Sequence, residues 1–206
     1  MPILYSYRRC PYAMRARIAL TMAEIKIEIR EISLREKPAH MLQVSPKGTV
    51  PVLILQDGTV LEQSLAIMQW ALQQNDPQGL LKSDFKMTHA LIAENDSHFK
   101  QALDGYKYPE RNLQKAQIEH RKNGEVFLQK LESQLLTSPY LLGQNPSLAD
   151  IAIFPFVRQF VAVDNAWFDG GDMQRPPYQK LHDWLNEWVN SVLFKSITTK
   201  NPTYIG

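Results

Sequence analysis

The chain has 206 residues, a formal net charge of +2, 44% hydrophobic residues and 21% charged residues. This composition is typical of an ordinary globular protein, and so small a net charge excludes the strongly basic proteins that attract nucleic acid through their overall field. One cysteine cannot form a disulfide within the chain, and no apolar run reaches the roughly 18 residues of a membrane span. We therefore expect a cytoplasmic protein with neither nucleic acid nor membrane as a partner.

Short strand-like and helical patterns alternate along the first part of the chain. The apolar-polar alternation of Ile27–Glu31 is typical of a half-buried strand. Asp57-Gly58, between two apolar runs, predicts a β-hairpin. The order is βαβαββα, an α/β unit that begins with a parallel crossover and ends in a hairpin. Its expected elements are the strands Ile3–Tyr7, Ile27–Glu31, Val52–Leu55 and Thr59–Leu61 and the helices Pro11–Ala23, Lys37–Val44 and Ser64–Gln74.

The rest of the chain has helical patterns and no strand signal of any weight. Turn-forming residues at Asn75–Gly79 separate the two parts. We predict a first domain at residues 1–76, a linker at about 77–83 and an all-α helical-bundle domain at 84–206. The expected helices of this second domain are Asp84–Tyr106, Asn112–Leu136, Ser147–Val163 and Tyr178–Leu193.

Ser147 and Asp150 stand at the start of one of these helices with the Ser-x-x-acid spacing of a capping box. In such a box each side chain accepts a hydrogen bond from the other residue's backbone N–H. We interpret the pair as structural rather than catalytic, and expect replacement of either residue to cost about 1 kcal/mol or more.

Cys10 is the candidate reactive residue. It follows a strand-like run and two arginines, and Pro11 after it suits the first position of a helix. The positive end of a helix dipole and adjacent cationic charge lower the pKa of a thiol and favour the thiolate. The alternative is that Cys10 is a small apolar core residue, as many lone cysteines are.

Four segments resemble the cysteine-type cytosolic glutathione transferases, especially the omega-like and lambda-like classes. Tyr5–Arg17 resembles their active-site segment, Gly48–Leu53 their glutathione-binding loop and Gln63–Ile67 their γ-glutamyl-binding turn. Asn145–Ala152 resembles the buried capping motif of their helical domain. The resemblance implies a thioredoxin-like N-terminal domain followed by the all-α domain.

The resemblance also implies which residues bind glutathione. Val50 precedes a cis Pro51 and would pair its backbone N–H and C=O with the cysteinyl part of the ligand. Ser64, expected to cap the helix that follows it, would hold the γ-glutamyl carboxylate with help from Gln63. Many family members have an acid in place of Gln63, and a neutral amide contacts the ligand's ammonium less strongly. Lys37 would reach the glutathione backbone, and the spacing of the histidines predicts no metal site.

A cysteine in this place predicts a particular reaction. Its thiolate attacks an oxidised centre and becomes linked to glutathione as a mixed disulfide. Position 13 is Ala, so no second cysteine resolves this intermediate and a second glutathione must do so. We predict a glutathione-dependent thiol transferase or reductase, acting in deglutathionylation or dehydroascorbate-type reduction. Its partners would be glutathione, a small disulfide or electrophilic second substrate and, by the resemblance, a second copy of the chain.

Two alternatives stay open at this point. A hydroxyl of Tyr5, Ser6 or Tyr7 could activate glutathione in a conjugating transferase, which would leave Cys10 without a role in the reaction. The fold could also serve as a binding or regulatory protein that has lost turnover, because fold does not determine function.

Overall fold

The computed structural model describes residues 1–171 and 178–205. Its contacts divide the chain into two compact units. The first contains Met1–Gln78 together with the segment from Ser191 onward, and the second contains Gly79–Asn190. Within the described residues, no helix combines the length and the apolar character needed to cross a membrane.

The first unit is built on a mixed sheet of four strands in the order β2-β1-β3-β4. β1 runs parallel to β2 and antiparallel to β3, and β3 pairs antiparallel with β4. The predicted crossover and hairpin are therefore confirmed. The strands are β1 (Ile3–Ser6), β2 (Glu28–Glu31), β3 (Val52–Ile54) and β4 (Val60–Leu61).

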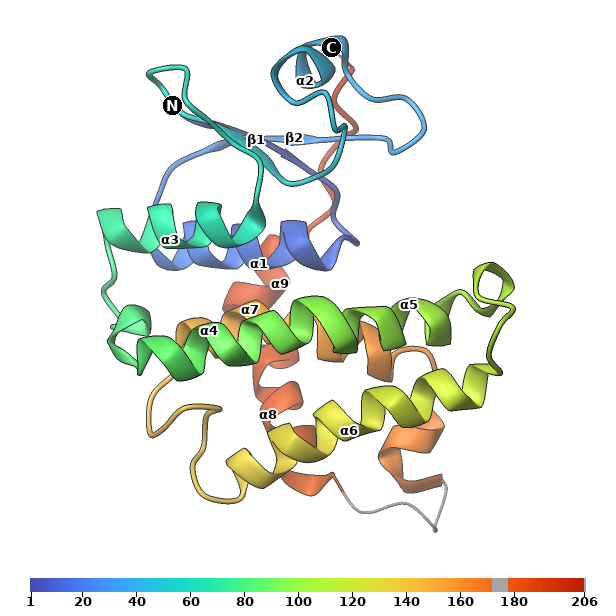
Figure 1. The fold of residues 1–206 in the computed structure, drawn as a ribbon. Helices are drawn as coiled ribbons and strands as arrows, with labels where there is room; N and C mark the ends of the chain where they lie inside the picture. Colours follow the sequence, from blue (N-terminus) through green and yellow to red (C-terminus); the bar gives the residue numbers. More distant parts are fainter. Residues whose placement is uncertain (172–177, 206) are drawn as a thin grey trace. The chain divides into compact units, whose positions relative to one another are not determined.

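Helices cover both faces of this sheet. Figure 1 shows α1 (Pro11–Met22) and α3 (Ser64–Gln74) on one face and α2 (Ala39–Val44) on the other. Because strand side chains alternate between faces, Leu4 and Tyr5 enter different cores although both are fully buried. Tyr5 packs in a cluster with Met41 of α2. The order of elements is the βαβαββα predicted from the sequence.

The segment from Ser191 onward folds back onto the first unit. Ser191 Oγ accepts a hydrogen bond from Phe194 N at 3.0 Å and so begins a separate helix, α9 (Val192–Ile197), which packs on α1. Further on, Tyr204 N donates to Glu31 O at 2.7 Å. The expectation that one helix continues to Leu193 is wrong, because a serine cap interrupts it.

The second unit is helical. α4 and α5 are joined into one long helix through a π-helical turn, η2 (Figure 1). It begins at Asp84, whose Oδ1 accepts from Met87 N at 2.8 Å, close to the predicted start. The core contains tilted aromatic ring pairs, with Phe99 4.8 Å from Phe127 and 5.2 Å from Phe160 between ring centroids. The helices are α4 (Phe85–Glu94), η2 (Asn95–Phe99), α5 (Lys100–Lys107), α6 (Gln117–Leu135), α7 (Leu148–Val161) and α8 (Gln179–Asn190).

The predicted capping box is confirmed at the start of α7. Ser147 Oγ accepts from Asp150 N at 3.4 Å, and Ser147 N donates to Asp150 Oδ2 at 2.8 Å. Asp150 is fully buried and also accepts from Leu141 N at 3.0 Å and Trp184 Nε1 at 2.9 Å. Burial raises the pKa of this carboxyl above its usual range, and these hydrogen bonds oppose the shift. Asp150 thus joins the start of α7 to the preceding loop and to α8.

Candidate functional site

Cys10 lies between β1 and α1, at the N-cap position and directly before Pro11. Its backbone is extended (φ −77°, ψ 122°), and its N–H donates to Tyr7 O at 2.9 Å, which closes the turn from strand to helix. The half-buried thiol is directed toward the backbone of Val50, with Sγ 3.7 Å from the carbonyl oxygen. The fold therefore brings together two predicted site residues that are 40 positions apart in the chain.

A buried acid holds the loop that carries Cys10. Glu31, at the end of β2, accepts from Arg8 N at 2.5 Å and lies 3.7 Å from Arg17 Nη1. Burial lowers the pKa of the Arg17 guanidinium, and the charge of Glu31 opposes that shift. The Arg8 guanidinium also donates to Thr198 O at 3.4 Å, in the segment after α9. Sequence reasoning missed Glu31, whose only signal was its position at the end of a predicted strand.

The loop before β3 carries the next predicted residues. The Val50–Pro51 peptide bond is cis, as expected. Pro51 is buried and Val50 half-buried. Gly48 has a positive φ of 59°, and a Cβ built on it would lie 3.2 Å from Lys37 Nζ. The Lys37 ammonium therefore lies beside this loop, so the structure also brings Lys37 into the neighbourhood of Val50.

The start of α3 differs from the prediction in one respect. The N-cap residue is Gln63, which is exposed and makes no capping hydrogen bond with its side chain. Ser64 is the first residue of the helix and is buried, and its Oγ accepts from Arg15 Nε at 2.9 Å. The expectation that Ser64 caps the helix is therefore wrong, because Ser64 already lies in the first turn, one residue after the N-cap position. Neither Arg15 nor this contact was predicted from the sequence.

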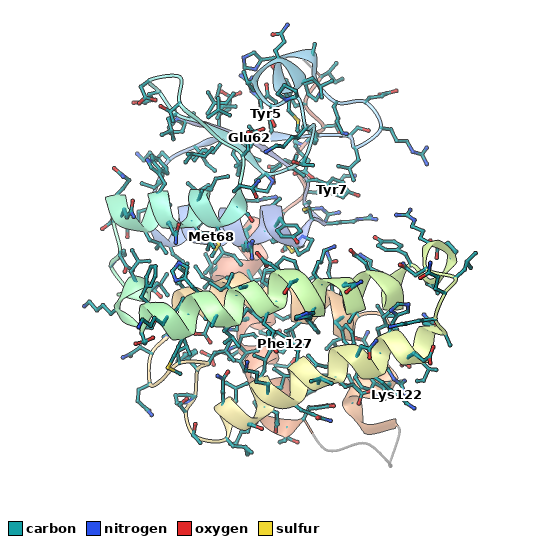
Figure 2. All side chains as sticks on the ribbon, in the orientation of Figure 1. Tyr5, Tyr7, Glu62, Met68, Lys122 and Phe127 are labelled. Carbon is teal, nitrogen blue, oxygen red and sulfur yellow. The ribbon has the colours of Figure 1, made fainter. Side chains whose placement is uncertain are left out.

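The three hydroxyl residues before Cys10 lie in packed surroundings. Tyr5 is fully buried, and its hydroxyl is 2.8 Å from His40 Nδ1 and accepts from Arg30 Nη1 at 2.9 Å. Ser6 is fully buried as well. Tyr7 is half-buried and packs against the cluster around Tyr5, and Figure 2 labels both tyrosines in the α/β unit.

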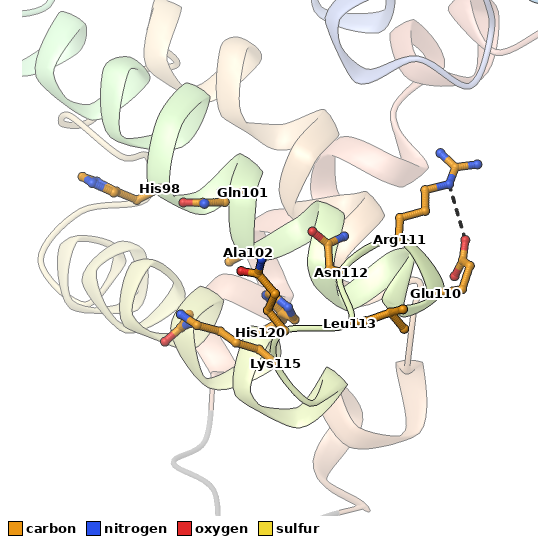
Figure 3. Close-up of a pocket in the computed structure, with 11 residues that line it drawn as sticks. His98, Gln101, Ala102, Glu110, Arg111, Asn112, Leu113, Lys115 and His120 are labelled. Carbon is orange, nitrogen blue, oxygen red and sulfur yellow. Dashed lines mark ion pairs between the residues drawn. The ribbon is translucent and has the colours of Figure 1, made fainter.

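A cavity of about 690 Å³ lies in the helical unit, between α5 and the start of α6 (Figure 3). None of the predicted site residues lines it. His120 on its wall is buried and packs so closely on Gly105 that a Cβ there would fall 2.2 Å from His120 Nδ1. In the part of the chain that the structure describes, no cluster of three or more His, Cys, Asp or Glu side chains could hold a metal ion.

Comparison with known families identifies the fold. Residues 4–79 match the model of the glutathione S-transferase N-terminal domain, and residues 116–187 match the model of the C-terminal domain of the same family. The chain belongs to the glutathione S-transferase family. All the predicted site residues of this transferase, from Cys10 to Ser64, lie within the first of these matches.

Individual relatives of the transferase come from more than one branch of the family. Maleylacetoacetate isomerase of Mus musculus is 32% identical over 173 residues, which cover 76% of each chain. Glutathione S-transferase omega-1 of Mus musculus is 24% identical over 164 residues, covering 78% of this chain and 68% of the relative. A family member from Pseudomonas fluorescens, crystallised with two glutathione molecules bound, superposes with a TM-score of 0.79 at 16% identity, over 96% of this chain and 92% of that one. At that identity the likeness shows a shared fold.

Proposed function

We propose that this glutathione transferase is a cysteine-type thiol transferase, with Cys10 as the nucleophile and glutathione as the cosubstrate. The observation that carries the proposal is the position of the Cys10 thiol, half-buried at the start of α1 and 3.7 Å from Val50 O. A ligand paired with the Val50 backbone would have its cysteinyl sulfur beside that thiol.

The start of α1 is a suitable place for a thiolate. The first N–H groups of a helix have no partner within it and carry positive partial charge, which stabilises an anion. Arg8 and Arg9 add positive charge in the two preceding positions. A thiolate has no proton to donate, so ionisation of Cys10 would also release Val50 O to accept a hydrogen bond from the ligand.

The proposed glutathione site uses three parts of the α/β unit. The backbone of Val50, positioned by Pro51, would pair with the cysteinyl part of the ligand. The open start of α3, with Gln63 and the hydroxyl of Ser64, would hold the γ-glutamyl carboxylate, because helix N-termini bind anions. The Lys37 ammonium, which lies beside Gly48, would reach the ligand backbone.

The reaction is two successive thiol–disulfide exchanges. In the first, the Cys10 thiolate attacks the glutathione sulfur of a mixed disulfide, the old sulfur–sulfur bond breaks and the other thiolate leaves and takes up a proton. In the second, the thiolate of another glutathione attacks the glutathione sulfur bound to Cys10 and regenerates the Cys10 thiolate. The net change converts the mixed disulfide and one free glutathione into a free thiol and oxidised glutathione.

The packing of Tyr5 argues against this residue as the activator in a conjugating mechanism. The Tyr5 hydroxyl, in contact with His40 and Arg30, lies on the face of the sheet that α2 covers. A residue that activates glutathione must instead donate a hydrogen bond to the sulfur of the bound ligand.

Mass spectrometry after incubation with oxidised glutathione tests the proposal. We expect one glutathionyl group on the peptide that contains Cys10, removed again by reduced glutathione, and none on the Cys10→Ser protein. A protein that binds glutathione by calorimetry but never forms this adduct would contradict the mechanism. Two hypotheses would then remain. The protein would be a conjugating transferase, detected with a chlorinated aromatic substrate, or a binding protein without turnover.

The identity of 32% to the mouse isomerase favours a second candidate, glutathione-dependent isomerisation of maleylacetoacetate. A direct assay with that substrate tests this candidate, and the disulfide exchange assay tests the first. As the resemblance implies, we also expect a homodimer, which light scattering would detect.

A further inference from the structure

Arg15 is a buried arginine with no role in the function proposed above. It lies on α1 with 2% of its surface exposed, and its Nε donates to Ser64 Oγ, which is 5% exposed, at 2.9 Å. The guanidinium carbon is also 5.0 Å from the centroid of the Tyr12 ring. Both contacts help to orient the guanidinium.

The contact with Arg15 determines what the Ser64 hydroxyl can do. A hydroxyl has one proton and two acceptor lone pairs. Because the guanidinium donates to Ser64 Oγ, it occupies an acceptor position and leaves the hydroxyl proton to be donated elsewhere. The buried positive charge polarises the O–H bond in the same sense, since hydrogen bonds to charged groups are stronger than neutral ones.

The Ser64 hydroxyl lies at the start of α3, where a bound anion would accept its hydrogen bond. Gln63 provides no side-chain cap there, so the first N–H groups of the helix are available to an outside acceptor. The hydroxyl of Ser64 and these N–H groups are all donors, and the helix dipole favours a negative charge at the same point. A carboxylate is an acceptor of matching charge.

Resting on the proposed function, we propose that Arg15 is a positioning residue for the γ-glutamyl carboxylate of glutathione. It acts through Ser64, by holding the hydroxyl as a donor and adding positive potential beneath the start of α3. Its own guanidinium stays buried and does not contact the ligand. Arg15 therefore sets affinity for the γ-glutamyl end and leaves the exchange step at Cys10 unchanged.

Two disulfides separate affinity for the γ-glutamyl end from the chemistry. Oxidised glutathione and oxidised cysteinylglycine each transfer one half of the disulfide to Cys10 and release the other half as a thiolate. Only oxidised glutathione carries γ-glutamyl groups. The rate of adduct formation is followed by mass spectrometry against disulfide concentration, which yields a half-saturating concentration and a limiting rate for each.

We expect Arg15→Met to raise the half-saturating concentration of oxidised glutathione about tenfold, equivalent to about 1.4 kcal/mol. The limiting rate, and the whole rate profile with oxidised cysteinylglycine, should change less than about twofold. Arg15→Lys, which keeps the charge, should recover part of the loss. Arg17 supplies the matched control, since it is equally buried on the same helix. Arg17→Met should change the adduct-formation rates with the two disulfides by the same factor.

A double-mutant comparison keeps the test decisive if Arg15→Met does not fold. In a Ser64→Ala background, Arg15→Lys should add no further change, because the hydroxyl through which it acts is gone. Equal losses with both disulfides in the Arg15 variants, or additive effects with Ser64→Ala, would show a structural role only. A wild-type protein that neither disulfide modifies would overturn the proposed function instead.

Discussion

The helices of this protein differ in whether the N-cap side chain accepts a hydrogen bond from the first turn. The start of α7 has such a cap, and the starts of α1 and α3 do not. At α7, Ser147 and Asp150 exchange hydrogen bonds, and the buried Asp150 also accepts from the loop before it and from Trp184. At α1 and α3, the N-cap residues Cys10 and Gln63 make no capping hydrogen bond with their side chains.

Helix N-termini therefore serve two purposes in this protein. The first turn of every helix has N–H groups that need an acceptor from outside the helix. Where the chain supplies the acceptor, as at α7, the helix start stabilises the fold. Where the N-cap side chain supplies none, as at α1 and α3, the positive end of the helix dipole favours a thiolate or a ligand carboxylate.

Replacing the sulfur at the start of α1 should have the largest effect on activity. We expect Cys10→Ser to lose glutathione–disulfide exchange nearly completely, because the exchange needs a thiolate nucleophile. Circular dichroism and urea unfolding should match the wild type, because the hydroxyl remains a suitable N-cap. Retention of most of the exchange activity would show that Cys10 is not the nucleophile. The start of α1 would then have no role in the reaction.

The closed start of α7 should show the reverse pattern. Asp150→Ala leaves the N–H groups of Ser147, Leu141 and Trp184 buried without their acceptor, and we expect a loss of about 3–5 kcal/mol in the free energy of unfolding. Urea denaturation measures it. In the folded fraction, the half-saturating concentration of glutathione should stay within about twofold of the wild type. A specific loss of glutathione affinity at unchanged stability would mean that Asp150 takes part in binding.

The two serines at helix starts give the smallest and most direct comparison. Ser147→Ala removes a cap and should cost about 1 kcal/mol of stability without changing glutathione affinity. Ser64→Ala leaves Arg15 Nε without its acceptor, so it should cost about 1–2 kcal/mol, and it should also weaken glutathione binding. Calorimetry and urea denaturation on both variants measure the two quantities. Equal glutathione affinity in the two variants would contradict the proposed role of Ser64.

Much of the fold could be predicted because its signals are local. Alternation in Ile27–Glu31, the Asp57-Gly58 turn and the Ser147–Asp150 spacing each depend on a few neighbouring residues, and each prediction is confirmed. The missed interruption at Ser191 was local too, since a serine before an apolar run is itself a helix-start signal. The cis bond before Pro51 came from the resemblance to the family rather than from the residues alone.

The sequence by itself determined the order of elements, the family resemblance and the choice of Cys10 as the reactive candidate. Only the tertiary structure decided that Glu31 holds the loop before Cys10, that Arg15 holds Ser64, and that the segment after Ser191 belongs to the first unit. Helix periods, turns and caps are set within a few positions of the chain. Arg15 and Ser64 are 49 positions apart and meet only because α1 and α3 pack together on one face of the sheet.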